Sequence, residues 1–219
     1  LAAGLSYRRI EDIFLLRGQS PLLSANQPLL LHRQDTVLLV MEGAVDIFAV
    51  PLVDGKADGS RTYLYRAGQQ QIVPGLHRAE FAGPFGLMAV AGPQTSVLSL
   101  PCAHFYSFLA ETELCDGAGL LLATWFDGLA SSLSCKLPPK ETTELTPGTG
   151  MVLQPQQSTG TSGELLWVRH REGSSLFLGH EAVAVAAEPH YIPHPRHLWL
   201  TAREPAVLEV TTSSACALE

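Results

Sequence analysis

The sequence predicts a mainly β protein made of two tandem β-rolls that are joined by a helical segment. Fifteen Pro and nineteen Gly are spread through the 219 residues, which favours many short elements connected by turns. Short runs of Val, Leu, Ile and Tyr have the two-residue period of strands on both sides of residues 103–136, where the period becomes helical. We expect an N-terminal helix in 1–19, a first β-roll over 20–102, a linking helical segment over 103–137 and a second β-roll over 138–216.

The first half is predicted to be a helix followed by strands. Residues 7–17 place apolar side chains at helical intervals, and Gly18 follows as a helix end. The polar segment 54–59 is expected to be a hairpin loop. Turn residues bound each expected strand, and these strands are 29–31, 36–41, 44–50, 61–66, 70–73 and 96–100.

The linking segment is predicted to be an amphipathic helix. One face of it carries Leu122, Trp125, Phe126, Leu129 and Leu133, with Asp127 and Ser131 opposite. We interpret this stripe as packing against a neighbouring β-roll, and the alternative is a helix that presents the stripe to a partner. Pro138-Pro139 ends the helix and marks the expected domain boundary.

The second half returns to the strand pattern, and it shows a weak similarity to the first. Strands are expected at 150–154, 164–170, 174–178, 182–187, 198–202 and 206–211, and 156–163 is expected to be a polar loop. Two segment pairs are similar: 37–40 followed by Glu42-Gly43 with 165–168 followed by Glu172-Gly173, and 97–100 with 207–210. Two copies of one β unit explain this better than a single large sandwich.

Charge and cysteine content narrow the class of protein. A net charge of -7 without a Lys/Arg run would repel a phosphate backbone, so nucleic acid is not expected as a partner. No run approaches the roughly 18–20 apolar residues of a membrane span. Cys102, Cys115, Cys135 and Cys216 form no C-x-x-C pair, and such isolated thiols favour a reducing, cytoplasmic location, including the cytosolic face of the inner membrane. The chain lacks an initiator Met, so we expect a piece of a longer protein, with 217–219 as a tag remnant.

Residues 38–48 (LLVMEGAVDIF) are the most informative strand pair. An apolar strand turns at Glu42-Gly43, where Gly supplies a positive φ, and returns with alternating burial. This resembles the strand–Gly–strand signature of cyclic-nucleotide-binding domains, and Tyr65-Arg66-Ala67-Gly68 sits where that family has the Gly-containing turn before its phosphate cassette. The resemblance implies that both halves are cyclic-nucleotide-binding-like β-rolls, the double-stranded β-helix or jelly-roll fold, the second one degenerate.

Residues 85–97 resemble the phosphate cassette of that family. There, Phe-Gly-Glu opens a short helix whose N-terminal amides meet the cyclic phosphate, the Glu binds the ribose, and a later Arg pairs with the phosphate. Here Leu87 stands at the Glu position and Gln94 at the Arg position. Losing both anchors removes ~3–6 kcal/mol of binding, which is at least a hundredfold. The degenerate cassette consists of Phe85, Gly86, Leu87, Gln94, Thr95 and Ser96, and no cofactor is expected.

The wider pattern resembles the region before the membrane part of certain bacterial ABC exporters. These ATP-binding subunits are encoded with bacteriocin or modified-peptide precursors that carry nitrile-hydratase-like leaders (NHLM/NHLP-type). The resemblance is carried by 45–52, 54–55, 59–61, 63–66, Trp125, 166–169, 177–179 and 198–202. It implies a non-catalytic cytosolic regulatory or docking module, a leader peptide or the exporter core as partner, and ATP hydrolysis elsewhere; a homodimer is also compatible with it. The chain has no G-x-x-x-x-G-K-[ST] segment, which agrees with this.

A metal-dependent, cupin-like enzyme is the alternative. His190, His194 and His197 lie close together in the sequence, and His180, Glu181 and Glu188 precede them. The first half has no equivalent cluster, and Pro189, Pro193 and Pro195 interrupt the run, so an irregular loop with solvated imidazoles is the preferred interpretation. No G-x-S-x-G elbow is present, and we expect no catalytic residues and no metal.

Overall fold

The computed structural model describes residues 2–21, 23, 27–76, 84–133, 138–148, 150–163, 165–185 and 190–216. The chain divides into two compact units, Leu1–Leu121 and Leu122–Glu219. This division falls inside helix α3 (Cys115–Leu133), and the boundary expected at Pro138-Pro139 stays a prediction. Cys135, Glu188, the ends of the strands expected at 164 and 186–187, and the expected remnant 217–219 lie outside the described residues.

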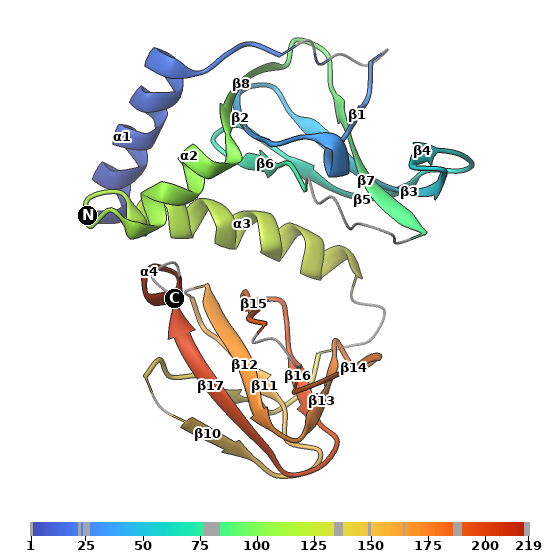
Figure 1. Ribbon diagram of the computed structural model, residues 1–219, viewed down its shortest axis with the longest axis vertical. Helices are drawn as coiled ribbons and strands as arrows, with labels where there is room; N and C mark the ends of the chain where they lie inside the picture. The colour runs from blue at the N-terminus through green and yellow to red at the C-terminus, as the bar shows by residue number, and fades with distance from the viewer. Residues whose placement is uncertain are drawn as a thin grey trace. The chain divides into compact units, whose positions relative to one another are not determined.

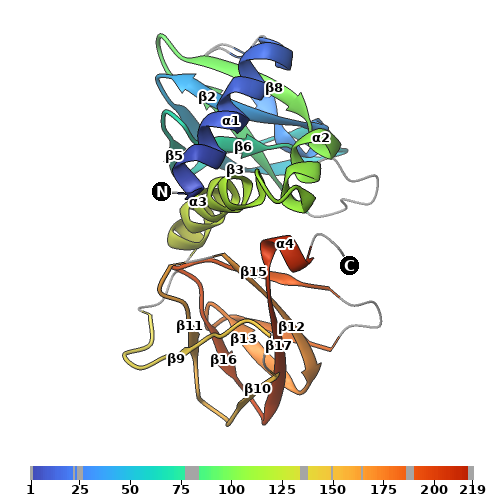
Figure 2. The same ribbon diagram turned by 90° about the vertical axis from the view of Figure 1, so that its left-hand side faces the viewer.

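Helices in the first unit cover one side of its strands. The predicted N-terminal helix is confirmed as α1 (Ala2–Arg17), which begins earlier than the pattern indicated and buries Ile10 and Phe14 beside strand β8 (Ser96–Pro101). The Gly18 amide donates to the Phe14 carbonyl at 2.8 Å, so the helix ends where expected. After β8 the chain forms α2 (Cys102–Ser107), the 3-10 turn η2 (Phe108–Ala110) and α3. Figures 1 and 2 show α1 beside these elements.

Two antiparallel sheets form the body of the first unit (Figure 1). One has the order β1 (Leu29–Leu30), β7 (Phe85–Ala91), β3 (Val45–Val53), β4 (Lys56–Ala57), with β5 (Thr62–Ala67) also paired to β3. The other has the order β6 (Ile72–Pro74), β2 (Thr36–Glu42), β8. The short 3-10 turn η1 (Leu31–Arg33) follows β1. Strand β2 is the centre of the core, since Val37, Leu38, Leu39 and Val40 are all buried.

The hairpin after β3 is tighter than expected. Asp54 and Gly55 have φ of 51° and 66°, so they form a two-residue turn, and Lys56–Ala57 already pairs back onto β3. A two-residue turn with both φ positive matches the twist of the flanking strands and favours Asp-Gly. The loop predicted over 54–59 is therefore only partly a loop.

The second unit also consists of two main sheets. One has the order β10 (Gly150–Leu153), β17 (Ala206–Thr212), β12 (Leu166–Glu172), β15 (Ile192–His194). The other has the order β14 (Glu181–Ala184), β13 (Ser174–Phe177), β16 (Leu200–Ala202). A short parallel pair, β9 (Thr143–Glu144) with β11 (Thr159–Gly160), and the helix α4 (Ser213–Cys216) complete it. Apolar residues of β10, β12, β16 and β17 form its core.

The six strands expected in the second half are confirmed where they are described, whereas β9, β11 and β15 were not expected. Strand β11 lies in the segment predicted as a polar loop, and β15 lies in the segment predicted as an irregular His-containing loop. Pro193 is compatible with β15 because this strand lies at the edge of its sheet, where β12 is its one neighbour among the described strands. None of the described helices combines the length and the apolar character that a membrane span requires.

Four strand ladders of the first unit have counterparts in the second, whereas β1·β7, β3·β4, β10·β17 and β9·β11 are each found in one unit alone among the described residues. The pairs β2·β8, β2·β6, β3·β5 and β3·β7 have the antiparallel counterparts β12·β17, β12·β15, β13·β14 and β13·β16. The register shifts at the same place in both long ladders, between Val40 and Glu42 and between His170 and Glu172. Each shift is followed by a glycine, Gly43 or Gly173, with φ of 73° or 74°.

The correspondence differs from the one that the sequence suggested, by two residues between β2 and β12 and by one residue between β8 and β17. Val97 pairs with Val40, and Leu208 pairs with His170, so Val97 corresponds to Leu208 and not to Val207. A shift of one residue exchanges the two faces of a strand. Burial agrees with the new register, because Val97 and Leu208 are both buried.

Candidate functional site

The segment that resembles the phosphate cassette is a strand. Residues Phe85–Ala91 form β7, which pairs with β3 on one side, from Val45↔Ala91 to Pro51↔Phe85, and with β1 on the other. The short helix expected at Phe85-Gly86 is therefore wrong. Most side chains from 85 to 91 alternate between buried and more exposed positions. Such a segment is stabilised by two neighbouring strands and leaves no helix N-terminus to meet a phosphate.

Gly86 has a packing role in this strand. A Cβ placed on it would lie 3.0 Å from His32 Nδ1 and 3.0 Å from Leu52 Cδ1. The glycine therefore leaves room for two neighbouring side chains, and no phosphate is needed to explain it. Leu87 lies in the same strand and is half-buried, opposite Ala49 of β3.

The later part of the cassette forms the turn between β7 and β8. Gln94 is exposed with φ of 56°, and Ser96 begins β8 opposite Glu42. The Thr95 hydroxyl donates to the Ala44 carbonyl at 2.8 Å and accepts from the Ala44 amide at 3.2 Å. A Cβ on Gly43 would lie 2.7 Å from this hydroxyl. Thr95 thus holds the Gly43 turn against the β7–β8 turn.

The three candidate metal ligands do not converge. His190 and His197 are exposed, whereas His194 is completely buried in β15, so the expectation of solvated imidazoles is wrong for His194. His197 Nδ1 lies 3.4 Å from Asp127 Oδ1, and the His197 amide donates to the same oxygen at 3.1 Å. In the part of the chain that the structure describes, no group of three His, Cys, Asp or Glu side chains could hold a metal ion.

His194 instead belongs to a buried polar pair. Its Nε2 lies 2.8 Å from Thr159 Oγ1, and the Leu200 amide donates to that oxygen at 2.9 Å. Burial lowers the pKa of His194 from 6.5 to about 4, because the imidazolium loses its hydration there. The imidazole is therefore neutral at physiological pH and links β15 to β11 and β16.

A second buried pair lies at the β12–β13 turn. His170 Nε2 lies 3.0 Å from Ser175 Oγ, and both residues are buried. Burial also lowers the pKa of His170. The first unit has Val40 and Val45 at the corresponding positions. The second unit therefore has a buried titratable group at a turn where the first unit has two apolar side chains.

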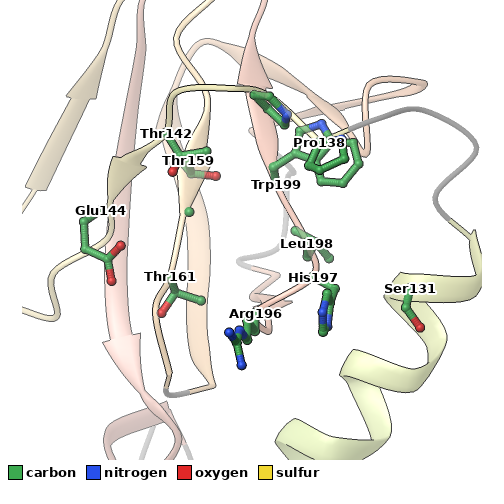
Figure 3. Close-up of a pocket in the computed structure, with 12 residues that line it drawn as sticks. Ser131, Pro138, Thr142, Glu144, Thr159, Thr161, Arg196, His197, Leu198 and Trp199 are labelled. Atoms are coloured by element: carbon green, nitrogen blue, oxygen red, sulfur yellow. The ribbon is translucent and has the colours of Figure 1, made fainter.

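A pocket of about 410 Å³ lies in the second unit, next to the Thr159–His194 pair. Figure 3 shows Glu144 of β9 on one wall and Arg196 with His197, from the segment between β15 and β16, on another. Apolar parts come from Pro138, Pro139, Leu198 and Trp199. The remaining lining residues are small or hydroxyl-bearing: Ser131, Thr142, Thr159, Gly160 and Thr161.

The charged groups of the pocket differ in how they are held. Glu144 Oε1 accepts two hydrogen bonds at 2.8 Å, from the Ser162 amide and the Ser162 hydroxyl. His197 is held by Asp127 of α3. The Arg196 side chain is exposed, and no hydrogen bond or ion pair of it is seen among the described residues. The pocket therefore presents a positioned carboxylate and an adaptable guanidinium.

Sequence reasoning missed Glu144, Thr159 and Arg196. Thr159 and Thr161 alternate, which is a strand signal, but the glycines around them favoured a loop. No local pattern could indicate that β11 passes beneath His194, because the two residues are 35 positions apart. The pocket is assembled from distant segments, and this placement is decided by the tertiary structure.

Comparison with known proteins finds solved structures that match this chain at low sequence identity. No protein-family model and no curated protein matches the sequence. Among solved structures, the chain is similar to oxidized CprK in complex with o-chlorophenolacetic acid, with 12% identity and a TM-score of 0.39 over 57% of this chain and 51% of that chain. It is similar to the Catabolite Activator Protein of Thermus thermophilus, with 20% identity and a TM-score of 0.37 over 54% of each chain.

Cyclic-AMP-bound PfPKA-R is similar over more of the sequence, with 8% identity and a TM-score of 0.34 over 95% of this chain and 75% of that chain. The chain spans about half the length of the CprK chain that it matches. All three TM-scores lie below 0.5.

Proposed function

We propose that the chain is a non-catalytic regulatory and docking module with two β-rolls of the cyclic-nucleotide-binding type, and that the first roll no longer binds a cyclic nucleotide. The observation that carries the loss of nucleotide binding is the pairing of β7 with β3 over its whole length, and with β1 at Met88 and Ala89, because it uses the cassette segment as a strand. Four antiparallel ladders of the second unit that have counterparts in the first support the proposal of a second roll, in which β10·β17 is an addition.

Loss of nucleotide binding follows from backbone and side chains together. A cyclic phosphate is held by amide groups that point at it and by an arginine. In β7 the backbone lies in an extended ladder with β3, joined by β1 at Met88 and Ala89, and Leu87 and Gln94 carry no charge. The two missing anchors alone correspond to ~3–6 kcal/mol of binding.

The partner belongs to the proposal as well. The resemblance to exporter subunits supports a cytoplasmic role beside a peptide exporter of the ABC type, with a leader peptide or the exporter core as the bound partner. The net charge of -7 supports a protein or peptide partner over nucleic acid. In this context the chain regulates or docks, and ATP hydrolysis takes place elsewhere.

Calorimetric titration of the full chain with cyclic AMP and cyclic GMP tests the first part. We expect no binding at millimolar nucleotide, and micromolar affinity for either would overturn it. The double variant Leu87→Glu with Gln94→Arg restores the side-chain anchors in sequence. It is expected to remain silent, because the amides of β7 stay in their ladders.

The docking part needs a separate measurement. The full chain is immobilised, and a synthetic leader peptide of the nitrile-hydratase-like type and the detergent-solubilised exporter core are passed over it. Binding of at least one of them, unchanged by added cyclic nucleotide, is the expected result. If neither binds while the chain is folded by circular dichroism, the docking role is refuted.

A further inference from the structure

We infer that the pocket of the second unit binds a small zwitterion with an apolar body, namely a free amino acid or a dipeptide with apolar side chains. The inference rests on the pocket alone and is independent of the exporter context. It joins three observations, which are the size of the pocket, its apolar wall and its two unlike charges.

The size and the wall set the body of the ligand. The volume of about 410 Å³ lies near the lower end of the range of pockets for small molecules. Leu198 and Trp199 are almost fully buried, so they form a firm wall beside the two prolines. A short apolar side chain is the group that such a wall takes up without leaving a polar atom unpaired.

The unlike charges set the two ends of the ligand. Glu144 and Arg196 lie on different walls (Figure 3), and no ion pair joins them among the described residues. Ser162 fixes the Glu144 carboxylate through Oε1, which leaves Oε2 for an ammonium group. The Arg196 guanidinium is the fork that fits a carboxylate.

Two further polar groups of the pocket, on His197 and Thr159, are already engaged. Asp127 accepts from the His197 amide and lies beside its imidazole, so these two groups hold each other. Thr159 Oγ1 serves His194 and Leu200. A ligand with only one charge would therefore leave either Glu144 or Arg196 unmatched, whereas an amino acid matches both.

Three probes that share the leucine side chain test the inference on the full chain by calorimetry: L-leucine, N-acetyl-L-leucine without the ammonium charge, and L-leucinamide without the carboxylate. We expect L-leucine to bind and each blocked probe to bind about tenfold more weakly, the effect of one exposed charge-assisted contact. Comparison of L-leucine and L-phenylalanine with the dipeptide Leu-Leu distinguishes a free amino acid from a dipeptide as the ligand. Absence of binding by leucine, phenylalanine and Leu-Leu at millimolar concentrations would overturn the inference.

Matched variants connect the affinity to the two residues. Arg196→Gln is expected to weaken leucine about tenfold and to leave leucinamide unchanged, since leucinamide has no carboxylate to lose. Glu144→Gln is expected to weaken leucine equally and to leave N-acetyl-leucine unchanged. Arg203→Gln and Glu172→Gln remove the same charges at exposed positions outside the pocket and should change nothing. Equal loss with all four variants, or the same affinity for all three leucine probes, would refute the assignment.

Discussion

The two units share a backbone turn, a register shift followed by a glycine, but differ in the side chains that surround it. In each, a register shift in the long ladder is followed by a glycine with φ near 74°, and the glycine packs against the start of the partner strand, at Thr95 or at Ala206. The first unit surrounds this turn with buried Val40 and Val45, and the second has His170 and Ser175 at the corresponding positions. The glycine and the ladder thus determine the turn, whereas the core behind it accepts either an apolar or a hydrogen-bonded polar pair.

This difference has a consequence for acid stability. The second unit contains two buried imidazoles, His170 and His194, whose pKa values burial lowers. All three tryptophans, Trp125, Trp167 and Trp199, also lie in this unit. Tryptophan fluorescence therefore follows the unfolding of the second unit, and far-UV circular dichroism follows both, so the two units can be compared in one protein.

Replacing the two glycines is expected to have the largest effect. Gly173→Ala places a Cβ 2.3 Å from the Pro205 carbonyl oxygen at positive φ, and Gly43→Ala places one 2.7 Å from the Thr95 hydroxyl. We expect losses of about 3–4 kcal/mol in the free energy of unfolding, greater at Gly173 because its nearest backbone atom lies at 2.3 Å, against 2.9 Å at Gly43. Urea unfolding measures both. Gly163→Ala, which meets no atom within 4 Å, is the control, and equal stability of all three variants would contradict the shared role.

Acid is expected to destabilise the second unit by a similar amount. His194 has a pKa of about 4 in the folded chain and 6.5 when exposed, so protons bind preferentially to the unfolded form. The stabilisation is complete above pH 6.5 and is lost as the pH falls toward 4, by about 3 kcal/mol. His170 acts in the same direction.

The paired variant Thr159→Val with His194→Leu isolates this contribution. It removes the buried imidazole together with its hydrogen-bond partner. The difference between wild type and variant cancels the titration of the carboxylates. Urea unfolding followed by tryptophan fluorescence between pH 7 and pH 4 is expected to show a flatter profile for the variant, and identical profiles would contradict the assignment.

Replacing the polar pair His170–Ser175 of the second unit by the apolar Val–Val pair found in the first unit is expected to have a smaller effect. His170→Val or Ser175→Val alone leaves a buried polar group without its partner, which costs about 2 kcal/mol. The double variant recreates the Val–Val pair of the first unit and is expected to be nearly neutral. Urea unfolding of the four proteins gives the coupling energy, and additive losses would show that the pair does not act as a unit.

Introducing a residue of the second unit into the first, at Thr95, is expected to have the smallest effect. Thr95→Ala introduces the residue found at the corresponding position 206 and removes the hydroxyl that binds both the amide and the carbonyl of Ala44. We expect a loss of about 1 kcal/mol, seen by circular dichroism and not by tryptophan fluorescence. Thr62→Ala, exposed on β5, is the control, and an equal loss there would remove the special role of Thr95.

Local pattern was sufficient where neighbours in sequence set the conformation. The N-terminal helix, the strands around Gly43 and Gly173, and the Asp54-Gly55 turn follow from period and from turn chemistry. The central part of the stripe on α3 is also buried, at Leu122 and Trp125, although Leu133 is exposed.

Pattern was insufficient where distant strands decide the environment. Resemblance to a cassette outweighed the apolar character of 85–91, and only pairing with β1 and β3 shows it to be a strand. His194 looked solvated between two prolines, but the edge position of β15 tolerates Pro193 and turns the imidazole inward. The pocket around Glu144 and Arg196 likewise has no local signal.

By itself, the sequence determined that this protein is mainly β, and where most strands and the two glycine turns lie. Only the tertiary structure decided which residues correspond in the strand ladders of the two units, the strand at 85–91, the burial of His194 and the assembly of the pocket. The physical reason is that period and turn chemistry act over a few residues. Register and burial depend instead on partners that the chain brings together from far apart.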